Sequence, residues 1–119
     1  MPQQLEKDLR EIEQLLYNAQ STYPEIARTA AQARFDYEMA KAQAVFDIDS
    51  RAVADGTKKP TLPVQDAEAT LMIAKEKEAA RIAEAELDIA RKTIDSIESR
   101  LSSIQTRAKL THIEMALAR

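Results

Sequence analysis

Residues 54–66 read ADGTKKPTLPVQD, and this stretch decides how the rest of the chain folds. It contains Gly56, the only glycine among 119 residues, and two of the four prolines. Glycine readily adopts the left-handed conformation that ends helices, whereas proline cannot continue a helix. Thr61 or Asp66 can cap a following helix. The stretch therefore predicts a turn between a helix that ends near residue 54 and another that begins between residues 62 and 67.

Apolar residues repeat every 3.5 positions on both sides of this turn. Before it, the repeat passes through Leu5, Leu9, Ile12, Leu16, Ala19, Tyr23, Ile26, Ala30, Ala33, Tyr37, Ala40 and Ala44. After it, the repeat passes through Ala69, Ile73, Glu76, Ala80, Ala83, Leu87, Ala90, Ile94, Ile97, Leu101, Ile104, Ala108, Thr111, Met115 and Ala118. A repeat sustained over this length is typical of a coiled-coil seam.

The composition favours the same fold class. The chain is 45% hydrophobic, 31% charged and only 4% aromatic, and a single glycine provides too few turn residues for a many-stranded sheet. There is no cysteine, which excludes disulfides and fits a reducing compartment. No apolar run is long enough to cross a bilayer, so we expect no membrane partner.

We predict an all-α fold, a long antiparallel helical hairpin that forms a coiled coil, is Ala-rich near its loop and oligomerises. Folding the chain back at the turn pairs residues whose numbers sum to about 119, which brings small residues opposite small ones near the turn. The prediction is a single domain over residues 1–119. Its first helix covers about 3–54, its loop 55–65 and its second helix about 66–118.

Pro24 interrupts the first apolar repeat without changing its phase. Residues 22–25, TYPE, read as a capping box with proline in the first turn, or as a kink in one continuous helix. We expect the first, a break at residues 21–24 that separates a short N-terminal helix from a long one that is nearly collinear with it.

A second apolar stripe lies opposite the seam. On the first helix it contains Ala31, Phe35, Met39, Ala42, Phe46 and Val53, and on the second Ile82, Ile89, Leu110, Ile113 and Leu117. An isolated hairpin leaves this stripe in water, and each large side chain then forgoes roughly 1.5–3 kcal/mol. We expect the stripe to be an interface between copies of the chain, or else a groove for a different protein.

Side chains for catalysis are missing from the sequence. His112 is the only histidine, which argues against a Ser-His-Asp arrangement, and the residue three positions before it is Lys109 rather than the glutamate of a bundle di-metal site. We therefore predict no enzyme, no cofactor and no metal site.

Basic residues near the turn suggest a further partner. The net charge is −3, but Lys41, Arg51, Lys58 and Lys59 gather toward the loop. One chain would bind a phosphate backbone poorly, whereas an oligomer would present these cations many times. We name these four residues as candidate nucleic-acid contacts.

Three segments together resemble small helical phage proteins of the UvsY-like recombination-mediator kind: residues 33–42 (ARFDYEMAKA), 55–60 (DGTKKP) and 94–107 (IDSIESRLSSIQTR). The resemblance implies an oligomeric, non-enzymatic protein that binds single-stranded DNA and helps load a recombinase, in the cytoplasm of a bacterial host. It also implies DNA contacts by Arg51, Lys58 and Lys59. The assembly residues that it implies are Leu101, Ile104, Leu110, Ile113 and Leu117.

Two other classes of function fit the same features. One is a structural coiled-coil protein, such as a virion or assembly component. The other is an inhibitor or adaptor that covers another protein with its apolar stripe.

Overall fold

The computed structural model describes residues 2–118 and contains three helices and no strand over that range. They are α1 (Pro2–Ala54), α2 (Leu62–Met72) and α3 (Ala74–Leu117). Met1 and Arg119, the ends of the predicted domain, lie outside the described residues. The prediction of an all-α helical hairpin is confirmed.

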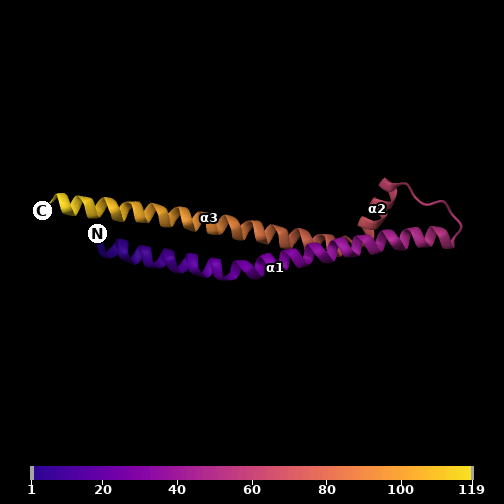
Figure 1. The fold of residues 1–119 in the computed structure, drawn as a ribbon, viewed down its shortest axis with the longest axis horizontal. Coiled ribbons are helices and arrows are strands. Elements are labelled where there is room, and N and C mark those ends of the chain that lie inside the picture. Colours follow the sequence, from indigo (N-terminus) through magenta and orange to yellow (C-terminus); the bar gives the residue numbers. More distant parts are fainter. Residues whose placement is uncertain (1, 119) are drawn as a thin grey trace. The chain divides into compact units, whose positions relative to one another are not determined.

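The expected break at residues 21–24 is wrong, because α1 is one continuous helix of 53 residues with Pro24 inside it. Figure 1 shows α1 as an unbroken ribbon. Instead of capping a new helix, the Thr22 hydroxyl donates to the carbonyl of Ala19 at 3.1 Å, and the Ser21 hydroxyl donates to that of Tyr17 at 2.7 Å. Both hydroxyls bond back to the preceding turn of a helix that continues.

The turn forms as predicted at its first end. Gly56 has a φ of 66°, in the left-handed region, and the N–H of Thr57 donates to the carbonyl of Ala52 at 2.9 Å. This pattern closes the last turn of α1. The loop is shorter than the predicted 55–65, because Thr61 is the N-cap residue and α2 begins at Leu62.

A change of direction at Ile73 divides the predicted second helix into α2 and α3. Ile73 has φ −116° and ψ 26°, outside the helical range. Its N–H still donates to the carbonyl of Ala69, and its carbonyl accepts from the N–H of Lys77. The apolar repeat continues through Ile73 without a slip, so the sequence pattern alone did not predict this bend.

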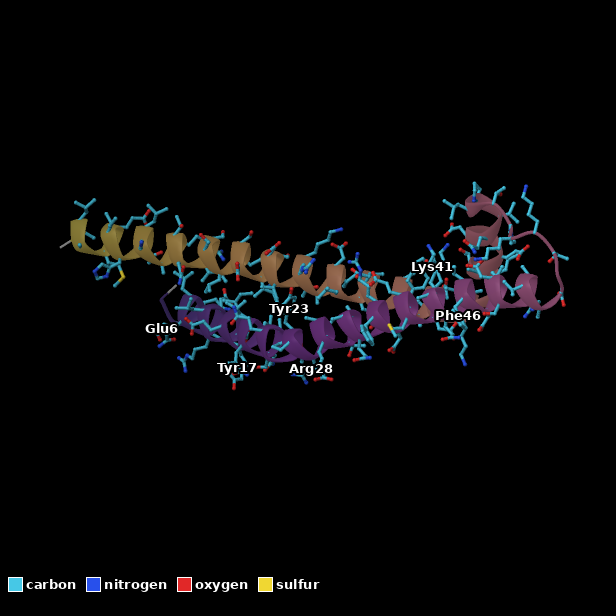
Figure 2. The ribbon with its side chains drawn as sticks, turned by 45° about the vertical axis from the view of Figure 1, so that its right-hand side comes forward. Glu6, Tyr17, Tyr23, Arg28, Lys41 and Phe46 are labelled. Carbon is cyan, nitrogen blue, oxygen red and sulfur yellow. The ribbon has the colours of Figure 1, made fainter. Side chains whose placement is uncertain are left out.

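The chain packs as two compact units. The terminal unit combines the part of α1 up to Glu25 with the part of α3 from Leu87 onward. Its core is a cluster of Ile12, Ile97 and Ile104, against which four half-buried side chains pack: Leu9, Leu16, Ala19 and Leu101. Tyr23 points toward α3 in Figure 2, and its hydroxyl accepts from Nε of Arg91 at 3.0 Å.

The loop unit is Ile26–Glu86 and has a core of its own, formed by Ala44, Ile48, Ala69 and Ile73. Arg34 of α1 lies 3.9 Å from Glu84 of α3. In both units, rising numbers on α1 meet falling numbers on the returning helices, which is the predicted antiparallel pairing.

Nearly all positions of the predicted seam are buried or half-buried in the structure, and only Met115 and Ala118 at its C-terminal end are exposed. The seam is therefore confirmed. Ile48 and Ala52 extend the buried face of α1 beyond the predicted repeat.

Candidate functional site

The most distinctive surface of the loop unit is an exposed apolar row on α1, which we call the α1 stripe: Phe35, Met39, Ala42 and Phe46. Its three large side chains are 58%, 56% and 64% exposed, in the order Phe35, Met39 and Phe46. At 3.6 residues per turn these four positions fall within about 60° of one another, and the seam positions of the same helix lie roughly 160° away. The second apolar stripe on α1 is therefore exposed, as predicted.

Figure 2 shows this separation of faces: Lys41 lies on the side of α1 that faces α2, and Phe46 lies on the opposite side. The packing of α1 against α2 and α3 therefore leaves the α1 stripe accessible in this chain.

Polar side chains beside the α1 stripe are bonded along the helix itself. Gln32 donates to Asp36 at 2.8 Å, Gln43 donates to Asp47 at 2.9 Å, and Arg34 pairs with Glu38 at 3.5 Å. These pairs flank the α1 stripe on both sides.

On α3, the structure divides the predicted assembly residues into two groups. Leu110, Ile113 and Leu117 are exposed, as the stripe prediction requires. Ile104 is only 7% exposed and belongs to the core of the terminal unit, and Leu101 packs against the same core. Leu101 and Ile104 are thus not free for an interface between copies, because they already pack against α1 within the chain.

The four predicted nucleic-acid contacts also divide. Nζ of Lys41 lies 2.8 Å from Oδ1 of Asp66, so this cation is already paired with α2. The hydrogen bond to Asp66, and then its charge, raise the pKa of Lys41. The same hydrogen bond and charge hold the pKa of Asp66 below its usual range.

The other three, Arg51, Lys58 and Lys59, are exposed around the end of α1 and in the loop. Within residues 2–118, no ion pair joins any of the three to an acid. These three cations share the turn with Asp55, and they form the accessible part of the predicted basic cluster.

The sequence pattern does not predict one polar contact that joins α2 to α1 beside the apolar core of the loop unit. Gln65 is the only buried polar residue of the described chain, and its side-chain amide donates to Oδ1 of Asp49. Its position 16 residues from Asp49, beyond two prolines and a loop, gives no periodic signal. The sequence pattern assigns Gln65 to the loop 55–65.

The terminal unit contains a groove of about 330 Å³ between its two helices. Acidic side chains of α1 (Asp8 and Glu11) and basic side chains of α3 (Arg100 and Arg107) line it together with Leu15. Acidic side chains near the N-terminal end of α1 thus lie beside basic side chains of α3 within this unit.

Among residues 2–118, no group of three or more histidine, aspartate or glutamate side chains is arranged to hold a metal ion. No helix in this range has an apolar stretch long enough to cross a membrane. No protein-family model, curated protein or solved structure matches the chain.

Proposed function

We propose that this protein works without catalysis, by self-association through the α1 stripe, as an assembly or binding protein. The observation that carries the proposal is the exposure of two phenylalanines and a methionine in one row on α1, on the face that the chain itself does not cover.

Exposure of the α1 stripe carries an energetic cost. Each exposed Phe forgoes part of the roughly 1.5–3 kcal/mol that burial of a large apolar side chain supplies. Single exposed apolar residues are common on protein surfaces, but an aligned row of large ones marks an interaction site. A second copy of the chain offers the same apolar row and can bury it.

Sedimentation velocity on the variant F35E/F46E tests this proposal. We expect wild type to sediment as an oligomer and F35E/F46E as a smaller species, with helicity in circular dichroism largely retained because both side chains lie outside the seam. The matched control is L62E/L71E, which places two acids at exposed leucines of α2 and should leave the mass unchanged. An unchanged mass for F35E/F46E would contradict the proposal.

Single-stranded DNA binding is a second candidate function, supported by the accessible cations Arg51, Lys58 and Lys59. An oligomer repeats this set, which increases its contact with a phosphate backbone. The recombination-mediator role implied by the resemblance would require this DNA contact and a recombinase as protein partner.

Titration of a long oligonucleotide at several salt concentrations tests the DNA contact. R51Q/K58Q/K59Q should weaken binding for every sequence alike and flatten its salt dependence. Each lost phosphate contact reduces the slope of log Kobs against log salt concentration by about 0.7. The control R100Q/R107Q/K109Q removes the same charge at the other end of the hairpin sequence and should have the smaller effect. A wild-type oligomer that binds no DNA even at low salt would favour the structural coiled-coil component, and a monomer would favour the adaptor.

A further inference from the structure

The α1 stripe reads nearly the same from either end. Its spacing is four, three and four residues, and it begins and ends with phenylalanine: Phe35, Met39, Ala42, Phe46. From this pattern we infer that the α1 stripes of two copies pair antiparallel, about a two-fold axis between residues 40 and 41. The inference rests on the proposed self-association and specifies its partner and orientation.

The two orientations differ in the middle layers of the stripe, because phenylalanine meets phenylalanine at both ends in either case. With residue numbers summing to 81 across the axis, Phe35 of one copy lies level with Phe46 of the second. Met39 then lies level with the second copy's Ala42, a large residue facing a small one. Layers that combine large and small side chains fill the space between helices evenly.

Parallel pairing in register fills the same space poorly. It would place Met39 against Met39 in one layer and Ala42 against Ala42 in the next. The first layer would be crowded and the second would leave a void, and both raise the free energy of an interface. The volumes of the stripe residues therefore favour the antiparallel orientation.

Polar side chains flank this interface. Asp36 and Gln43 lie on the same side of the α1 stripe, and antiparallel pairing brings Asp36 of one copy near Gln43 of the other. Asp47 of that copy lies on the same side and equally near, and within each chain Asp36 and Asp47 already accept hydrogen bonds from Gln32 and Gln43.

The stripe provides only a small interface area. Each exposed Phe of the stripe contributes on the order of 100 Å², and two faces with their flanks bury on the order of 1,000 Å² in total. This value lies near the lower bound for a specific interface. We therefore expect the dimer to dissociate on dilution.

Pyrene labelling distinguishes the orientations, because the chain has no cysteine of its own. Thr29 and Ser50 are exposed and flank the α1 stripe on one side, so T29C and S50C keep both phenylalanines. In the antiparallel dimer, residue 29 of one copy lies close to residue 50 of the other. Two copies of residue 29 are then about 34 Å apart, at 1.5 Å per residue.

We expect pyrene excimer emission from a mixture of labelled T29C and S50C, and none from either variant alone. The excimer emission should disappear when both labelled variants also carry F35E and F46E. Excimer emission from T29C alone would show parallel pairing and overturn this inference, while self-association through the stripe would stand. A dimer without excimer in any mixture would place the interface elsewhere and overturn it too. A monomer at all concentrations would overturn both this inference and the proposed function.

Discussion

At the scale of single residues, the ion pair between Lys41 and Asp66 shows how tertiary contact changes the role of a cation. In the sequence, Lys41 is one of four basic residues near a turn, and no sequence feature distinguishes its role from that of Lys58. In the structure Lys41 of α1 pairs with Asp66 of α2, next to the hydrogen bond from Gln65 to Asp49. Its positive charge is thus used within the fold.

This pair makes stability depend on pH in a defined direction. The folded-state pKa of Asp66 is lowered by the hydrogen bond from Lys41, so the stabilisation is present above the unfolded pKa of Asp66 and is lost as pH falls through the folded value. The pKa of Lys41 is raised, so the stabilisation is also lost as pH rises through that raised value.

We therefore expect D66N to unfold at a lower temperature than wild type between about pH 5 and pH 9, the range between the ordinary pKa values of Asp and Lys. The difference should vanish in acid, where wild-type Asp66 is protonated. Thermal unfolding followed by circular dichroism measures it. E68Q, at an exposed acid of the same helix, serves as control, and an equal pH profile for both variants would contradict the assignment.

At the scale of helices, Pro24 shows which signal controls helix continuity. Proline has no N–H to donate to the carbonyl of Gln20, and its ring is poorly accommodated inside a helix. The apolar repeat nevertheless keeps its phase across Pro24, and Tyr23 and Ile26 are both half-buried. Packing along the seam exceeds the local cost of proline, so α1 continues.

Replacement of this proline should stabilise the protein. We expect P24A to raise the free energy of unfolding by about 1–3 kcal/mol, because it restores one backbone hydrogen bond and removes the steric conflict. P63A, in the first turn of α2, should change it by less than about 1 kcal/mol, since proline is favourable at that position. Chemical denaturation measures both, and equal effects would show that Pro24 also stands at a helix start.

At the scale of the whole molecule, the single predicted hairpin has two separate cores. The terminal unit has isoleucines in its core, whereas the core of the loop unit contains Ala44 and Ala69 beside Ile48 and Ile73. Alanines allow close approach of helices but contribute less buried apolar area than isoleucines. Each unit therefore depends on a small number of large side chains.

Truncation of one isoleucine in each core tests this division. Ile12 is 2% exposed and Ile48 is 6% exposed, and either change to Ala should cost about 2–5 kcal/mol. We expect I12A to speed amide hydrogen exchange mainly in residues 2–25 and 87–117, and I48A mainly in residues 26–86. Uniform acceleration across the chain in both variants would show that the two cores unfold as one.

The sequence by itself determined the helical class, the seam, the turn at Gly56 and the exposed α1 stripe. These features depend on periodicity and on local backbone preferences, which neighbouring residues encode. Only the tertiary structure decided that α1 continues through Pro24 and that the returning helix bends at Ile73. The same holds for the pairing of Lys41 with Asp66. These outcomes depend on contacts between residues distant in the chain, whose energies exceed the local preferences that a sequence pattern reports.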